Sequence, residues 1–492
     1  MAHVGGIETE APPPLYAAPP TIYPRAVKGR IRRVKWVVLT VLLGLYYLVP
    51  WLRFDRGPGV PNQAVLVDIG NARLFFFWIE LWPQEVYFLT GALVLAAIGL
   101  FAATSLWGRV WCGFTCPQTV WTDLFIWVER LIQGDRNARM RRDAQPHSRD
   151  RTLRKLATHA AWIAIAAATG GAWIMYFNDA PSVVRDLATG AASVEVYFFF
   201  ALFTLTTYVL AGFAREQVCT YMCPWPRFQG AMLDENSMVV TYRDWRGEPR
   251  GKPREASSGD CVDCAACFHV CPTGVDIRQG QQLECIGCGL CVDACDDIMR
   301  KLDRPEGLIA FETLKNLAAS QAATAGMAPS PARFAAGMAA RATPRFLRPR
   351  TIMYAAVLGV VLAVMAAAFL MRETVSLAVI RDRAPLFVQL ADGSLRNGFT
   401  IKLVNKTQAQ VGYSLVLRGL DGATLLVQQA ELDPTGRPLL ATAPDGITEW
   451  RALVTIPLAR RLTGSHPVVF EILDASGLSI ASAPTTLVGP AP

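Results

Sequence analysis

The chain has 492 residues, of which 52% are hydrophobic and only 18% are charged, and its net charge at pH 7 is +8. This length allows several domains, and this composition is typical of a membrane protein rather than a soluble one. The basic residues cluster beside apolar runs, where membrane topology accounts for them, so nucleic acid is excluded as a partner.

We expect residues 1–34 to form a disordered cytoplasmic tail, because the first 24 residues are rich in Pro and Ala. Five uncharged apolar runs are close to the roughly 20 residues that a bilayer core requires. They cover residues 36–52, 86–107, 156–177, 196–213 and 351–371. We therefore predict a four-helix transmembrane domain over 35–215 and a fifth transmembrane helix over 351–371. Within the outer loop 53–85, the apolar run 74–79 is too short to cross and is expected at the membrane interface.

Lys and Arg predict the orientation. Six of them lie between residues 25 and 35, and ten lie between residues 109 and 155. Cytoplasmic loops carry an excess of these residues, so both segments are expected in the cytoplasm. Alternation of the spans then places residues 216–311 inside and residues 372–492 outside. All twelve cysteines fall on the inner side or at its membrane boundary.

A short motif, Cys-x-x-x-Cys-Pro, follows both the second and the fourth predicted span. The first copy holds Cys112 and Cys116, and the second holds Cys219 and Cys223. Pro117 is suited to the first position of a new helix. We expect that helix to be amphipathic over 117–133 and to lie along the membrane surface. Buried, inert thiols are the alternative, but the repetition favours metal or redox chemistry, and soft thiolates suit Cu(I).

Eight further cysteines form two runs in which three thiols stand three residues apart and a fourth follows four residues later. The runs are Cys261, Cys264, Cys267 and Cys271, then Cys285, Cys288, Cys291 and Cys295. This is the bacterial ferredoxin spacing, in which the fourth cysteine of each run ligates the other 4Fe–4S cluster. Cluster one would take Cys261, Cys264, Cys267 and Cys295, and cluster two would take Cys285, Cys288, Cys291 and Cys271. Zinc sites more often use pairs of cysteines, and disulfides are rare in the cytoplasm.

The remaining segments differ in character. Residues 312–350 are rich in Ala, Pro and Arg and are predicted to be a partly helical linker. Residues 372–492 show short apolar alternation at 376–380, 399–403, 413–417, 424–428, 450–456 and 468–473. This pattern predicts an all-β, immunoglobulin-like sandwich without a disulfide, with a barrel as the alternative. The predicted fold is thus a multidomain membrane protein: an α-helical bundle, an α+β ferredoxin domain over 216–311 and a β-sandwich over 372–492.

Residues 25–490 closely resemble the cytochrome c oxidase accessory proteins, the family called CcoG, FixG or RdxA. The resemblance is carried by the five spans, the paired Cys-x-x-x-Cys-Pro motifs, the sequence WCGFTCPQTVW at 111–121, the sequence ECIGCG at 284–289 and the outer β-domain. It implies a multi-pass bacterial inner-membrane protein that assembles the cbb(3)-type oxidase and reduces Cu(II) to Cu(I). Expected partners are copper ions, oxidase assembly factors or a copper transporter, and an electron donor that the sequence does not identify. The sequence is also compatible with a homo-oligomer.

Two other functions stay open. The spans and cysteines also resemble the membrane ferredoxin NapH, which would make the chain a quinol-linked electron relay. The fifth span and the outer domain argue against this, because that family has neither. A non-enzymatic copper chaperone with structural clusters is the third reading, and it predicts copper binding that is independent of cluster reduction.

Overall fold

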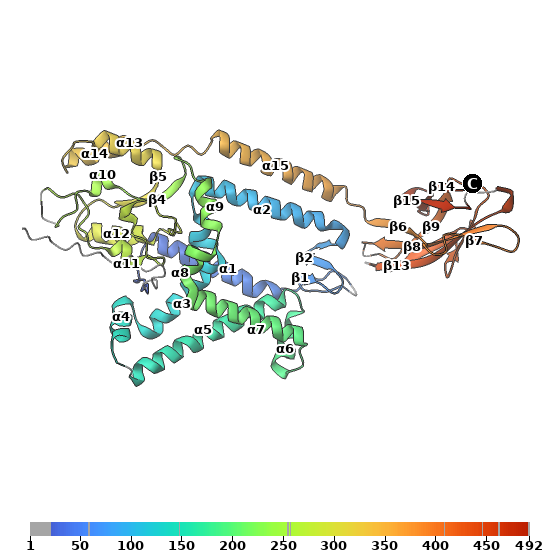
Figure 1. Ribbon diagram of the computed structural model, residues 1–492, viewed down its shortest axis with the longest axis horizontal. Coiled ribbons are helices and arrows are strands. Elements are labelled where there is room, and N and C mark those ends of the chain that lie inside the picture. The colour runs from blue at the N-terminus through green and yellow to red at the C-terminus, as the bar shows by residue number, and fades with distance from the viewer. Residues whose placement is uncertain are drawn as a thin grey trace, which may run out of the picture. The chain divides into compact units, whose positions relative to one another are not determined.

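The computed structural model describes residues 21–57, 60–146, 148–252, 255, 257–407, 409–444, 446–460 and 463–490. The chain divides into two compact units, residues 1–54 with 62–365 and residues 55–61 with 366–492. The first unit is mainly helical and contains all twelve cysteines, whereas the second is built from β-strands (Figure 1).

Long apolar helices dominate the first unit. Among the described residues, four helical segments are long and apolar enough to cross a membrane: Arg30–Trp51, Pro83–Trp107, Val194–Met222 and Pro349–Leu370. They contain the helices α1 (Arg30–Leu48), α2 (Val86–Trp107), α7 (Val194–Val209) and α15 (Pro349–Leu370). Four of the predicted spans are therefore apolar helices of sufficient length.

The remaining predicted span, 156–177, lies in α5 (Arg149–Met175), which pairs with α7. A Cβ atom added to Gly170 would lie 2.9 Å from the Thr204 nitrogen and 3.0 Å from the Phe200 carbonyl oxygen, so the two backbones are in direct contact. Small residues allow this close approach between membrane helices. α6 (Ala180–Thr189) connects α5 to α7, and the pair runs antiparallel.

The segment between α1 and α2 contains a small antiparallel sheet. Its strands are β1 (Val65–Asp68), β2 (Arg73–Phe76) and β3 (Ile79–Leu81). The apolar run 74–79 supplies β2 and the start of β3, and Phe75 in it is fully buried. Its expected position at the membrane interface stays a prediction. The sheet is fixed to the end of α5, since the Val67 amide donates to the Tyr176 carbonyl (2.8 Å).

α3 (Pro117–Gln133) begins at Pro117 as predicted, and it packs against α5. Its expected course along the membrane surface stays a prediction. Trp121 Nε1 donates to Thr169 Oγ1 (2.9 Å) and Gln133 Nε2 donates to Thr158 Oγ1 (2.8 Å). These two bonds fix α3 antiparallel beside α5. The short helices α4 (Arg136–Ala144), α8 (Arg215–Gln217) and α9 (Trp225–Met232) complete this part of the unit.

The ferredoxin segment is closed by β4 (Met238–Tyr242) and β5 (Ile309–Thr313), which pair antiparallel. Between them lie α10 (Asp244–Gly247), α11 (Ala266–Val270) and α12 (Leu290–Lys301).

The predicted linker is partly helical, with α13 (Leu314–Thr324) and α14 (Pro331–Ala339). It is docked rather than free, since a Cβ atom added to Gly337 would lie 2.3 Å from the Trp245 ring.

The N-terminal segment corrects one prediction. Residues 1–20 lie outside the described residues, but residues 21–34, predicted to be disordered, have a defined structure. The Arg25 amide donates to the His269 carbonyl (2.7 Å), and Asp293 of α12 accepts hydrogen bonds from the amides of Ile31 (3.2 Å) and Arg32 (2.7 Å). Asp293 thereby satisfies two free amides in the first turn of α1. The Pro and Ala content of the tail gives no indication of this contact.

The second unit is a sandwich of two antiparallel sheets, in the orders β10-β13-β8-β6, with β7 on β8, and β11-β12-β9-β14-β15. Its strands are β6 (Val375–Arg381), β7 (Val388–Gln389), β8 (Leu395–Asn405), β9 (Val411–Arg418), β10 (Thr424–Val427), β11 (Glu431–Leu432), β12 (Pro438–Thr442), β13 (Gly446–Ile456), β14 (Ser465–Leu473) and β15 (Ser479–Val488). Fully buried Phe399, Ile401 and Phe470 lie between the sheets. The sandwich prediction is confirmed and the barrel alternative is not.

Candidate functional site

The two ferredoxin runs have the same local backbone. In the first run, Asp263 and Ala265 flank Cys264 with φ values of 52° and 53°, and in the second run, Gly287 and Gly289 flank Cys288 with φ values of 69° and 70°. Left-handed backbone is easy for Gly and costs other residues about 1–2 kcal/mol. Each run therefore turns in the same way around its second thiol and then enters a helix, α11 or α12.

Cys261, Cys264, Cys267 and Cys295 line one pocket, together with Tyr242, Arg278 and apolar side chains. Cys295 comes from the second run, on α12, and reaches the pocket because α11 and α12 pack together. Burial raises the pKa of Cys295, and the neighbouring thiols of Cys267, Cys261 and Cys264 contribute to the shift. The structure thus brings together the four residues predicted for cluster one.

The other four cysteines of the runs form a second group. Burial raises the pKa of Cys291 well above its usual value, and its neighbours Cys288, Cys285 and Cys271 raise it further. The Val275 amide donates to Cys271 Sγ (3.3 Å). Hydrogen bonds of this kind to cluster sulfurs help to set reduction potentials. This group contains the four residues predicted for cluster two.

Each group offers the four cysteine sulfurs that an iron–sulfur cubane requires as ligands. Burial raises the pKa of the Cys267 thiol to about 11 and that of Cys285 to about 12. These thiols are therefore protonated at neutral pH when they are free. Since iron binds the thiolate, cluster insertion must displace these protons.

The two Cys-x-x-x-Cys-Pro motifs also share one local structure. Each begins in a π-helical turn, Trp111–Thr115 or Val218–Met222. The Cys116 amide donates to the Trp111 carbonyl (2.8 Å), and the Cys223 amide donates to the Val218 carbonyl (2.7 Å). π-Helical turns are uncommon and are frequent at functional sites. The sequence repeat is thus also a structural repeat.

The four motif thiols are neighbours. Burial raises the pKa of Cys112 to about 12, and the nearby thiols of Cys116, Cys219 and Cys223 add to the shift. Cys112 is buried and donates to Gln229 Oε1 (3.0 Å), whereas the other three thiols are partly exposed. No three His, Cys, Asp or Glu side chains within the described ranges are arranged as ligands of one metal ion.

The first motif lies directly against the second ferredoxin run. A Cβ atom added to Gly113 would lie 2.9 Å from the Gly287 carbonyl oxygen and 3.0 Å from the nitrogen and Cα of Cys288. Cys112 and Cys288 also belong to one buried apolar cluster. The backbone of the first motif therefore contacts the backbone of the second ferredoxin run directly, with no other layer of residues between the motif thiols and the second cysteine group.

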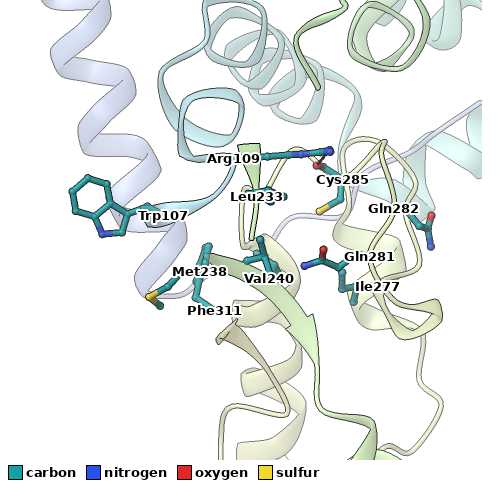
Figure 2. A pocket seen from close by; sticks show the side chains of 12 residues that line it. Trp107, Arg109, Leu233, Met238, Val240, Ile277, Gln281, Gln282, Cys285 and Phe311 are labelled. Atoms are coloured by element: carbon teal, nitrogen blue, oxygen red, sulfur yellow. Dashed lines mark hydrogen bonds between the residues drawn. The ribbon is translucent and has the colours of Figure 1, made fainter. Parts of the chain in front are cut away.

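Arg109 holds this junction in place (Figure 2). Its Nη1 donates to the carbonyls of Leu283 (2.5 Å) and Cys285 (2.8 Å), and its Nη2 donates to the Pro226 carbonyl (3.1 Å). One guanidinium thus connects the end of α2, the second ferredoxin run and α9. Pro226 follows the second motif closely, so Arg109 also fixes the two motifs relative to each other.

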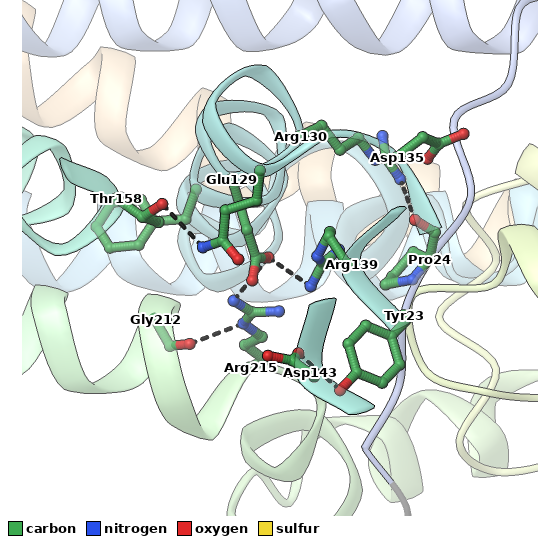
Figure 3. A network of polar contacts seen from close by, with 12 residues as sticks. Tyr23, Pro24, Glu129, Arg130, Asp135, Arg139, Asp143, Thr158, Gly212 and Arg215 are labelled. Atoms are coloured by element: carbon green, nitrogen blue, oxygen red, sulfur yellow. Dashed lines mark hydrogen bonds and ion pairs between the residues drawn. The ribbon is translucent and has the colours of Figure 1, made fainter. Parts of the chain in front are cut away.

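A second polar network supports the second motif (Figure 3). The buried Glu129 carboxylate of α3 accepts from Arg139 (2.8 Å) and Arg215 (3.0 Å). Arg215 has φ +35°, a strained value for this residue type, and its Nε donates to the Gly212 carbonyl (2.7 Å). Glu129 thereby anchors the turn from which the second motif begins.

Sequence reasoning did not identify Arg109, Gln229 or Glu129 as site residues. In the sequence, Arg109 is one of the ten basic residues that predict membrane orientation, and its position three residues before Cys112 is a usable signal for the site. Gln229 lies six residues after Cys223 and carries no local motif. Its contact with Cys112 exists only because the two repeats pack together.

Comparison with protein families supports this description. A model described as "4Fe-4S dicluster domain" matches residues 214–314, and one described as "4Fe-4S binding domain" matches residues 89–135. A third, the "IG-like fold at C-terminal of FixG", matches residues 365–490. The chain therefore contains iron–sulfur-binding domains and an immunoglobulin-like C-terminal domain.

Similar proteins cover most of the chain. "Nitrogen fixation protein FixG" of Rhizobium meliloti is 50% identical over 464 residues, which is 91% of this chain and 88% of the relative. "Protein RdxA" of Cereibacter sphaeroides is 47% identical over 88% of this chain and 91% of its own. "Ferredoxin-type protein NapH" of Escherichia coli is 25% identical over 55% of this chain and 90% of its own.

A solved structure of a FixG-related protein from Vibrio parahaemolyticus aligns with 24% of this chain and 97% of its own, with 20% identity and a TM-score of 0.20. The family is fixed by the sequence relatives, whose identity extends from the helical unit through the β-sandwich. The chain belongs to the FixG/RdxA family of polyferredoxin-type membrane proteins.

Proposed function

We propose that this membrane iron–sulfur protein reduces Cu(II) to Cu(I) at the cytoplasmic face of a bacterial inner membrane, for insertion into a cbb(3)-type oxidase. The observation that carries the proposal is the backbone contact between Gly113 and Cys288, which joins the motif thiols to the second ferredoxin group. Electron carriers are useful to a reductase only when they lie close to the site of reduction. Here that site is the group of four motif thiols.

Two 4Fe–4S clusters are assigned to the ferredoxin cysteines. Cys261, Cys264, Cys267 and Cys295 would hold cluster one, and Cys285, Cys288, Cys291 and Cys271 would hold cluster two. When bound, each cluster supplies a one-electron carrier. The chain places the Cys288 loop against the motif and leaves Cys264 exposed on the other group.

The motif thiols would receive copper. Cu(II) prefers nitrogen and oxygen ligands and Cu(I) prefers thiolates, so one-electron reduction favours transfer into a sulfur site. Cys116, Cys219 and Cys223 are partly exposed and can meet an incoming ion. Cys112 is buried, hydrogen-bonded to Gln229 and part of the same buried cluster as Cys288, so it would complete the site from the inside.

The proposed sidedness follows from the basic residues. The Lys- and Arg-rich segments before α1 and after α2 favour a cytoplasmic position for the N-terminus and the ferredoxin domain. The β-sandwich would then be periplasmic, where an oxidase assembly factor or a copper transporter can contact it. The name of the Rhizobium relative connects that protein with nitrogen fixation. Our proposal connects this chain with that process only indirectly, by way of the oxidase.

The test is a Cu(I)-chelator assay on the anaerobic, reduced protein. A variant with Cys112→Ser, Cys116→Ser, Cys219→Ser and Cys223→Ser should keep its iron and lose most of its Cu(II) reduction. Unchanged reduction in that variant would remove the four thiols from the mechanism. Copper binding that is the same for oxidised and reduced protein, without reduction, would instead favour the chaperone reading.

A quinol-linked relay is the second candidate, and the similarity to NapH favours it. That similarity covers 55% of this chain, so it does not account for the whole architecture. Reoxidation of the reduced protein by a quinone, but not by Cu(II), would support the relay over the reductase.

A further inference from the structure

A pocket of about 410 Å³ lies among α1, α3, α5 and α7. Four aromatic side chains line it: Tyr46, Trp121, Trp173 and Phe203. Ligand pockets typically have volumes of about 300–1,000 Å³ and combine aromatic walls with a few polar groups. Three of the surrounding helices are expected to span the membrane, so a ligand of this pocket would come from the lipid.

Polar groups without partners face this aromatic lining. The Thr206 hydroxyl donates to the Phe203 carbonyl, but the Thr207 hydroxyl has no hydrogen-bond partner among the described residues. Gln118 uses its Nε2 to donate to Thr122, Leu210 and Arg215, which leaves its Oε1 as an acceptor. In a membrane, where water is absent, unpaired polar groups favour a ligand that can bond to them.

The pocket adjoins the redox thiols. Pro117 forms part of its wall and is covalently bonded to Cys116. A lipid-soluble aromatic ring with oxygen atoms at its edge fits both the aromatic walls and the two polar groups. We propose that this pocket binds the ring of a membrane quinone or hydroquinone, and that hydroquinone is the electron donor for copper reduction.

The claim that hydroquinone is the electron donor rests on the proposed copper reduction. The overall reaction balances as follows. One hydroquinone and two Cu(II) ions give one quinone, two Cu(I) ions and two protons. The two O–H bonds of the hydroquinone break, and its two electrons reduce the two copper ions. Gln118 also lines a second pocket that contains Glu216 and Cys219, so the protons have an adjoining polar route away from the ring.

The binding test uses the full-length protein in nanodiscs and a benzoquinone with a ten-carbon chain, followed by quenching of tryptophan fluorescence. Thr207→Val should weaken binding about five- to tenfold, the effect of one lost hydrogen bond. Thr207→Phe, which fills the pocket, should abolish saturable binding. Thr90→Val is the matched control, because Thr90 is an exposed threonine on α2 outside the pocket, and it should bind like the wild type.

Photolabelling with an azidoquinone provides a readout that does not depend on the variants. The label should appear on peptides that contain Trp121, Trp173 or Phe203. Absence of saturable binding, or a label confined to other peptides, would overturn the proposal. If the quinone binds but dithionite-reduced protein fails to reduce Cu(II), the pocket stands and the copper function fails. If copper reduction is normal and no quinone binds, the copper function stands and the pocket proposal fails.

Discussion

The backbones of Gly113 and Cys288 are in van der Waals contact, and a Cβ atom added to Gly113 would lie 3.0 Å from both the nitrogen and the Cα of Cys288. Gly113 belongs to the first Cys-x-x-x-Cys-Pro motif and Cys288 to the second ferredoxin run. These two residues therefore form one of the direct contacts between the helical part of the unit and the domain that is assigned to electron storage.

Gly113→Ala should separate these groups. The added methyl group meets backbone atoms that cannot move cheaply, and overpacking of this kind costs about 1–3 kcal/mol. We expect single-turnover Cu(II) reduction to slow by about tenfold or more, because small misplacements strongly reduce rates. Iron content should be unchanged. Gly99→Ala is the control, because nothing lies within 4 Å of a Cβ atom at Gly99 in α2; equal rates for both variants would contradict the account.

Cys295→Ser tests the crossed assignment of the ligands. Although Cys295 is in the second run, it lines the pocket of the first group. Low-temperature EPR of the reduced variant should therefore lose the signal that Cys264→Ser also removes, and iron should fall by about four atoms per chain. Cys271→Ser should affect the other signal. Loss of the same signal from Cys295→Ser and Cys288→Ser would show that each run holds its own cluster.

Arg109→Lys should loosen the junction. Lysine cannot reproduce the three hydrogen bonds to Leu283, Cys285 and Pro226, and each unsatisfied buried carbonyl costs about 1–3 kcal/mol. We expect a lower thermal unfolding temperature and a lower iron content in the second group. Arg185→Lys, at a mainly exposed pair with Asp186, should leave both unchanged. An Arg109→Lys protein with full iron and unaltered thermal unfolding would refute the role given to Arg109.

Glu129→Gln should destabilise the turn that leads into the second motif. The substitution leaves Arg139 and Arg215 without their shared carboxylate, and breaking a buried pair typically costs about 3–5 kcal/mol. Thermal unfolding in detergent measures this change. Asp186→Asn removes an exposed carboxylate and should have an effect of about 0–1 kcal/mol. Similar effects of the two substitutions would show that Glu129 has no special structural role.

The sequence predicted the parts of the site that depend on local spacing. The ferredoxin runs were recognisable because Cys-x-x-Cys-x-x-Cys loops fix three thiols within a few residues, and the crossed grouping of Cys271 and Cys295 followed from the known spacing. The repeat of the Cys-x-x-x-Cys-Pro motif was visible for the same reason. Its ordered π-helical turns and the pairing of Cys112 with Gln229 depend on tertiary packing and were not predictable.

The fold shows the same division. All six strands predicted in the C-terminal domain are present, because one-sided burial produces apolar alternation. Four strands were missed. β7 and β11 have only two residues each, β12 begins with Pro438, and β15 has Ala, Ser and Thr where larger apolar residues would have marked a strand. The ordered segment 21–34 was missed because Asp293, which caps α1, is more than 250 residues away.

The most direct test of the central claim is an anaerobic Cu(II) titration of the dithionite-reduced protein, followed by EPR and by a Cu(I) chelator. The account predicts that the iron–sulfur signals disappear as Cu(I) forms, with one Cu(I) for each electron that the clusters lose. It also predicts that the variant with all four motif cysteines changed to serine retains its signals. Signals that persist in the wild type after Cu(II) is added, or that disappear equally fast in the four-serine variant, would contradict it.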